Sequence, residues 1–126
     1  MIVLDTHAWV WLATDDRRLG KAARRKLEAG GPRGVSAMSC WELALLVAHG
    51  RLKLDRDPLS WMEAALEELR VEVVPLTPAI AALAAGLRAL RDPADQVIAA
   101  TALSVSAELV TADEAITRSG LVRTLW

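Results

Sequence analysis

The chain has 126 residues, of which 53% are hydrophobic, and its 15 basic and 16 acidic side chains leave a formal net charge of −1. This composition excludes a disordered chain, and the length is sufficient for a hydrophobic core without a metal or disulfide staple. The near-neutral charge excludes a global electrostatic attraction to nucleic acid, so any such binding must depend on a local patch or a bound cation. The one cysteine, Cys40, cannot form an internal disulfide, which fits a reducing compartment.

The elements predicted along the chain alternate between short apolar runs and longer helical patterns. Strands are predicted at residues 2–4, 34–37, 71–76, 109–111 and 122–126. Helices are predicted at residues 18–29, 41–48, 59–69, 78–90 and from 92 to about 106, with a helical turn at 113–117. The alternation predicts an α/β fold, in a single domain over residues 1–126, whose strands are parallel and joined by crossover helices.

The hydropathy pattern bears on the location of the protein. No apolar run approaches the roughly 20 residues needed to cross a bilayer. The chain also begins directly with the apolar residues 2–4, without a basic leader or a long apolar segment. We therefore expect a soluble protein of the cytoplasm with no membrane association.

Four acidic side chains lie at positions that a parallel sheet can bring together. Asp5 directly follows the first strand, and Asp113 lies two residues past the strand at 109–111. Glu42 and Asp95 lie in the first turns of predicted helices that follow loops. Ligands of open parallel sheets bind outside the carboxyl ends of the strands, so these four acids can meet in one pocket.

Each acid also has a local structural interpretation. Ser39 with Glu42, and Thr111 with Glu114, fit capping boxes, in which the serine or threonine caps a helix and the glutamate bonds back to it. Asp92 fits an N-cap followed by proline, which leaves Asp95 in the first helical turn. Taken alone, the capping box is the better interpretation of Glu42, whereas Asp5 has the weakest local alternative.

The energies involved favour a cation if the four acids converge. Two carboxylates 4 Å apart repel by about 4 kcal/mol at an effective dielectric constant of 20, which exceeds the ~1 kcal/mol that a cap contributes. A shared pocket would therefore require a bound cation or protonation. Oxygen ligands favour a hard ion such as magnesium or manganese, and the lack of Cys/His ligand spacing argues against structural zinc.

Four motifs follow one another in a recognisable order: Leu4-Asp5-Thr6-His7, Ser39-x-x-Glu42, Arg91-Asp92-Pro93-Ala94-Asp95 continuing into Val97-Ile98-Ala99-Ala100-Thr101-Ala102, and Val110-Thr111-Ala112-Asp113. This order resembles the PIN-domain family, and most closely its VapC toxin branch. The resemblance spans essentially the whole chain, including Gly50-Arg51-Leu52 and the terminal Leu125-Trp126.

The resemblance implies a three-layer fold, with a central, mostly parallel sheet flanked by helices. It further implies a ribonuclease dependent on Mg²⁺ or Mn²⁺, which would be the toxin of a type II toxin–antitoxin pair that inhibits translation. Such a toxin cuts transfer, ribosomal or messenger RNA, and is usually a homodimer held inactive by a cognate antitoxin. By position, the resemblance makes Asp5, Glu42, Asp95 and Asp113 the metal-binding catalytic acids, with Thr6, Ser39 and Thr111 as polar support.

Two positions depart from the family pattern. Gln96 stands where the family often has arginine directly after the third acid, and Leu90 stands where it often has histidine before the Arg-Asp-Pro step. Neither departure removes a carboxylate. Both bear on substrate contacts and on the orientation of the third acid.

Basic and aromatic residues outside the four motifs have less specific interpretations. Six basic side chains within residues 17–26 can bind RNA phosphates or an acidic antitoxin segment, although a solvated helix face is the interpretation that the pattern favours. Trp9, Trp11, Trp41 and Trp61 lie in apolar helical patterns, which favours packing over base stacking.

Two alternative functions remain open from the sequence. A phospho-acceptor signalling domain also places acids and magnesium at strand ends, but that class has paired acids after the first strand and a lysine near the last strand. Here Thr6 follows Asp5, and Lys53 is the final lysine. A noncatalytic PIN-like interaction module would use the same scaffold only to bind a partner, and the intact acidic set argues against it.

Overall fold

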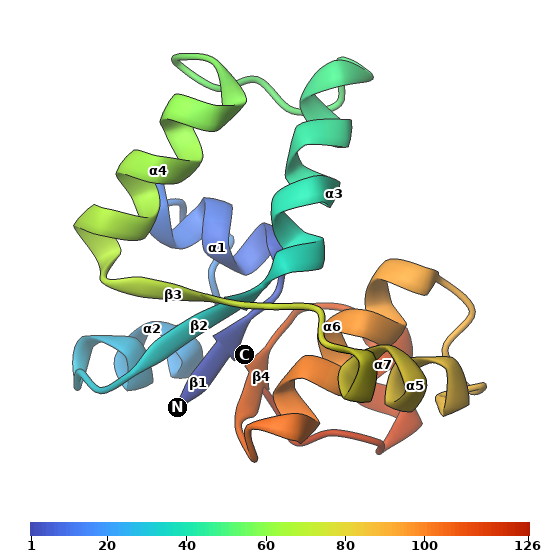
Figure 1. Ribbon diagram of the computed structural model, residues 1–126. Helices are drawn as coiled ribbons and strands as arrows, with labels where there is room; N and C mark the ends of the chain where they lie inside the picture. Colours follow the sequence, from blue (N-terminus) through green and yellow to red (C-terminus); the bar gives the residue numbers. More distant parts are fainter.

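A five-stranded sheet forms the centre of the molecule, in a computed structural model that describes all 126 residues (Figure 1). The strands are β1 (Ile2–Leu4), β2 (Arg33–Ser36), β3 (Val71–Val74), β4 (Glu108–Val110) and β5 (Thr124–Leu125). Their order in the sheet is β3-β2-β1-β4-β5, and every neighbouring pair is parallel. The α/β fold class predicted from the sequence is confirmed.

Seven helices cover the two faces of this sheet: α1 (Thr6–Ala13), α2 (Lys21–Glu28), α3 (Ala37–Ala48), α4 (Pro58–Leu69), α5 (Pro78–Gly86), α6 (Pro93–Ser104) and α7 (Glu114–Ser119). Figure 1 shows α1, α3 and α4 on one side of the sheet and α5, α6 and α7 on the other. None of the helices has the length and hydropathy that crossing a bilayer requires.

The core consists of two clusters of 14 buried residues, one on each face of the sheet. Helices α1 to α4 contribute to the first cluster, and α5 to α7 contribute to the second. Strand β1 supplies both, because Ile2 and Leu4 face the first cluster and Val3 faces the second. This alternation is the period of two that a buried strand requires, and it fixes the three-layer arrangement.

Helix α1 is the one regular element that the sequence analysis did not predict. Its sequence is hydrophobic at most positions, with Ala8, Trp9 and Val10 buried, so no polar stripe reveals a helical period. The sequence indicated only that Trp9 and Trp11 lie in an apolar helical pattern. The helix begins because Asp5 caps it, accepting a hydrogen bond of 2.8 Å from the Ala8 amide.

Other predicted boundaries are corrected by a few residues. Among the helices, α2 begins at Lys21 rather than 18, α3 begins at Ala37 rather than 41, and α5 ends at Gly86 rather than 90. Among the strands, β2 begins at Arg33 rather than 34, β3 ends at Val74 rather than 76, and β5 covers only Thr124–Leu125 of the predicted 122–126. The early end of α5 has a clear cause: after α5 the backbone carbonyls of Leu87 and Leu90 accept hydrogen bonds of 3.2 and 2.7 Å from the Gln96 side chain. These bonds hold residues 87–92 as a loop in front of α6.

Gly20 lies directly against the C-terminal residue, so we predict that Gly20→Ala destabilises the fold. A Cβ atom at Gly20 would overlap the carbonyl carbon of Trp126 and would lie 2.7 Å from its indole Cδ1. Overpacking of this kind costs about 1–3 kcal/mol. The control is Gly86→Ala, because nothing lies within 4 Å of a Cβ there. Urea denaturation should show a lower free energy of unfolding for Gly20→Ala only, and equal values for the two variants would contradict the packing argument.

Candidate active site

The sheet has its topological switch point between β1 and β4, whose carboxyl ends lie next to each other. From β1 the chain runs outward through β2 to β3, and β4 then pairs with the opposite edge of β1. The amide of Asp5 donates a hydrogen bond of 3.0 Å to the Val110 carbonyl, so these two strand ends stay paired. Such a switch point leaves an open crevice, and it is where ligands of parallel α/β sheets bind.

All four predicted acids line one cavity at this switch point. Asp5 follows β1, Asp113 follows β4, Glu42 lies on α3 and Asp95 lies in the first turn of α6. The cavity has a volume of about 450 Å³. Its remaining lining residues are Thr6, His7, Trp11, Arg18, Asp92 and Ala112.

Hydrogen bonds fix the orientation of three of these carboxylates. Asp5 caps α1 through the Ala8 amide at 2.8 Å, and Asp113 caps α7 through the Ile116 amide at 2.9 Å. The Thr6 hydroxyl donates to the Glu42 carboxylate, which links α1 to α3. Each cap engages one carboxylate oxygen, so the second oxygen of Asp5 and of Asp113 is not used by the helix.

The structure corrects two of the expected caps. Ser36, and not Ser39, caps α3, because the Ser36 hydroxyl accepts a 3.0 Å hydrogen bond from the Met38 amide. Asp113, and not Thr111, caps α7. The expected capping boxes at Glu42 and Glu114 are therefore wrong.

The expected cap of α6 is confirmed. Asp92 Oδ1 accepts a hydrogen bond of 3.0 Å from the Ala94 amide, and Pro93 is the first residue of the helix. Asp95 consequently lies at the third helical position, as the sequence predicted. Asp92 also lines the cavity, which its interpretation as a cap alone did not suggest.

The three residues expected to give polar support differ in their positions. Thr6 lines the cavity and bonds to Glu42. Thr111 is buried and does not line the cavity, and its hydroxyl accepts a 3.0 Å hydrogen bond from the Asp113 amide. Ser39 is completely buried, does not line the cavity, and its hydroxyl has no hydrogen-bond partner.

Burial and the crowding of acids change the pKa values of two of the carboxylates. Burial, followed by repulsion from Asp113, Asp92, Glu42 and Asp5, raises the pKa of Asp95 to about 7. Burial also raises the pKa of Asp5, although hydrogen bonds from the Thr111 side chain and the Ala8 amide oppose the increase. The cavity therefore has excess negative charge that its own cations do not balance.

The donor set suits a hard divalent ion, although the side chains do not form a closed coordination sphere. No group of three or more His, Cys, Asp or Glu side chains is arranged so that it could hold a metal ion as it stands. The acids offer oxygen atoms only, and the cavity leaves room for water between them. Magnesium commonly keeps several waters and needs only one or two direct carboxylate ligands, so the residues fit it.

These features define a class of α/β protein with an acidic pocket at the switch point of a parallel sheet. The family model described as PIN domain matches residues 2–120. The chain belongs to the PIN-domain family. This membership does not favour the alternative that the chain is a phospho-acceptor signalling domain.

Comparison with known proteins agrees with this assignment. The chain is 37% identical to Ribonuclease VapC22 of Mycobacterium tuberculosis over 114 residues, which cover 89% of this chain and 86% of that protein. It has the fold of VapBC2 from Rickettsia felis bound to a promoter DNA fragment, with a TM-score of 0.72, 20% identity and coverage of 99% and 98% of the two chains. A toxin–antitoxin complex from Klebsiella pneumoniae matches with a TM-score of 0.69, 18% identity and coverage of 100% and 97%.

We predict that Asp95→Asn stabilises the metal-free protein at alkaline pH. Because the folded-state pKa of Asp95 lies above its value of 3.8 in the unfolded chain, wild type loses stability as the pH rises from about 4 through about 7. The side chain is only half-buried, so after allowance for solvent screening the gain of the variant should be about 1–2 kcal/mol at pH 8.

The measurement is urea denaturation of both proteins with a chelator present, at pH 4 and pH 8. The gain should be small at pH 4, where Asp95 is mostly protonated in the folded state. Equal stability of the two proteins at pH 8 would contradict the excess negative charge inferred for the cavity.

Proposed function

We propose that this chain is a metal-dependent endoribonuclease whose catalytic, metal-binding acids are Asp5, Glu42, Asp95 and Asp113. The observation that carries the proposal is that four carboxylates from four separate segments line one cavity at the switch point of the sheet. The similarity to Ribonuclease VapC22 supports RNA as the substrate. Family membership over residues 2–120 supports the same chemistry.

The proposed reaction is hydrolysis of an RNA phosphodiester bond. When bound, a magnesium or manganese ion would lower the pKa of a water molecule and neutralise charge on the phosphate and the leaving oxygen. Asp5 and Asp113 are held at the starts of α1 and α7 by their capping hydrogen bonds, which keeps both carboxylates in place without reorganisation. Thr6 holds Glu42 on the opposite helix, so this carboxylate also faces the cavity in a defined orientation.

The wider setting follows from the same resemblance. We propose that the protein is a toxin of the cytoplasm that acts as a homodimer and is held inactive by a cognate antitoxin protein. The solved toxin–antitoxin complex with the same fold supports such a partner. A noncatalytic interaction module is the alternative, and it differs in needing none of the four carboxylates for partner binding.

We predict that Asp5→Asn, Asp95→Asn and Asp113→Asn each lower RNA cleavage by about 100-fold or more, because each removes a negatively charged metal ligand. Asparagine caps helices about as well as aspartate, so the first and last of these variants should keep the fold. The measurement is cleavage of labelled single-stranded RNA with Mg²⁺ or Mn²⁺, and with a chelator. Cleavage should stop with the chelator and return when the metal is added.

A matched control is Asp57→Asn. Asp57 also caps a helix, accepting a 2.9 Å hydrogen bond from the Ser60 amide, but it is exposed just before α4 and does not line the cavity. This variant should cleave as wild type does. Cleavage that persists with the chelator, or in both Asp5→Asn and Asp95→Asn, would overturn the proposal.

A further inference from the structure

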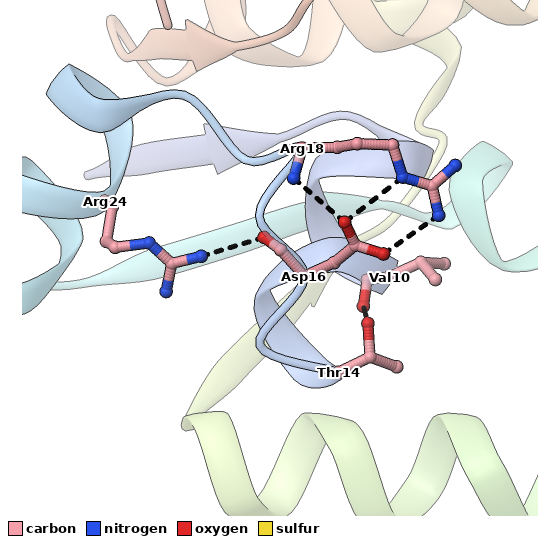
Figure 2. A network of polar contacts seen from close by, with 5 residues as sticks. All are labelled: Val10, Thr14, Asp16, Arg18 and Arg24. Atoms are coloured by element: carbon pink, nitrogen blue, oxygen red, sulfur yellow. Dashed lines mark hydrogen bonds and ion pairs between the residues drawn. The ribbon is translucent and has the colours of Figure 1, made fainter.

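The loop between α1 and α2, residues 14–20, is held in one conformation by a network of polar contacts (Figure 2). The Thr14 hydroxyl donates to the Val10 carbonyl at 2.8 Å, which fastens the end of α1. Arg24 reaches back from α2 and donates to the Asp15 carboxylate at 2.7 Å and to the Asp16 carbonyl at 2.8 Å. The loop is therefore tied to a helix at each end.

Within this loop, Arg18 is held along only one edge of its guanidinium group. Its Nε and Nη2 donate to the two oxygens of Asp16 at 3.1 and 2.9 Å, and its Cζ lies 5.0 Å from the centre of the Trp11 ring. A guanidinium group has five N–H donors, and Asp16 engages two of them. Figure 2 shows the remaining nitrogen of Arg18 pointing away from Asp16, so the Nη1–Nη2 edge is free.

The position of Arg18 separates it from the other basic residues of the segment. Arg18 is exposed, as are Arg17, Lys21, Arg25 and Lys26, but of these five residues only Arg18 lines the acidic cavity. It is the one lysine or arginine among the lining residues, against five acids. A phosphate that enters the cavity therefore meets one fixed cation of the protein.

We propose that Arg18 binds a phosphate of the RNA strand at the mouth of the cavity, with Asp16 and Trp11 as its positioning residues. The inference rests on the proposed function, since it names a contact to the substrate of that same site. Two N–H groups on the free edge match two phosphate oxygens, a bidentate geometry that arginine provides and lysine does not. Because Asp16 and Trp11 already orient this exposed side chain, binding costs less rotamer entropy than it would for an arginine without these contacts.

The first test measures RNA binding without cleavage, in the Asp95→Asn background. Binding of a labelled single-stranded oligonucleotide is followed by fluorescence anisotropy at a fixed low Mg²⁺ concentration and several NaCl concentrations. Arg18→Gln should raise Kd about tenfold and lower the slope of log K against log salt by about 0.7, the value for one phosphate contact on a single strand. Arg17→Gln removes the same charge from the same loop outside the cavity, and it should change neither quantity.

A second set of variants separates geometry from charge. Arg18→Lys should keep the salt slope of wild type, because it keeps the charge. Its affinity should lie between those of Arg18→Gln and wild type, because the bidentate contact is lost. Asp16→Asn should also weaken binding, although less than Arg18→Gln, since the guanidinium remains but is less firmly held. In the cleaving protein, Arg18→Gln should raise KM more than it lowers kcat, as expected for a contact made before the transition state.

The outcomes distinguish this inference from the function on which it rests. If wild type cleaves RNA and Arg18→Gln equals Arg17→Gln in Kd, salt slope and KM, the phosphate contact is overturned and the proposed function stands. If RNA binding depends on Arg18 but wild type does not cleave, the contact stands and the nuclease is overturned. If wild type neither binds nor cleaves RNA, both are overturned.

Discussion

Mutual repulsion of carboxylates in one cavity is the constraint to which the rest of the structure responds. Two such groups at close range cost several kcal/mol, so the elements that carry them must be held by something stronger. The two apolar clusters supply that force, because each large buried side chain contributes about 1.5–3 kcal/mol. Burial, and after it repulsion from the neighbouring carboxylates, raises the pKa of Asp95, so the fold brings these groups together without relieving the charge.

The local and functional roles of the acids are compatible, and this was not apparent from the sequence. In the sequence, capping boxes at Glu42 and beside Asp113 and a first-turn position for Asp95 are alternatives to metal binding, and Asp5 has only a weak local alternative. At Asp5 and at Asp113 the cap engages a single carboxylate oxygen while the side chain still lines the cavity, so capping is compatible with the proposed metal binding. The helix N-terminus also favours an anion there, which partly offsets the repulsion within the cavity.

The sequence predicted the alternation of elements from local patterns, and it predicted that the four acids line one cavity from the position of ligands at the strand ends of parallel sheets. It failed where two local patterns compete or where the pattern is absent. Ser36 and Ser39 are both acceptable caps, and only the packed position of α3 decides between them. Helix α1 was missed because it lacks a polar face that would reveal a helical period. The place of Arg18 in the lining of the acidic cavity depends on the loop after α1, whose position no periodicity predicts.

The near-neutral charge of the chain explains why the position of one arginine matters. Screening reduces the interaction between exposed charges beyond about 8 Å at physiological ionic strength, so basic side chains on the outer face of α2 contribute little to the potential inside the cavity. If RNA is the substrate, as proposed, its attraction to the cavity would depend on a bound cation and on Arg18, the one lysine or arginine in the lining. The contacts that fix residues 14–20 place that guanidinium before any substrate arrives, and α1 joins this loop directly to Asp5 at the cavity.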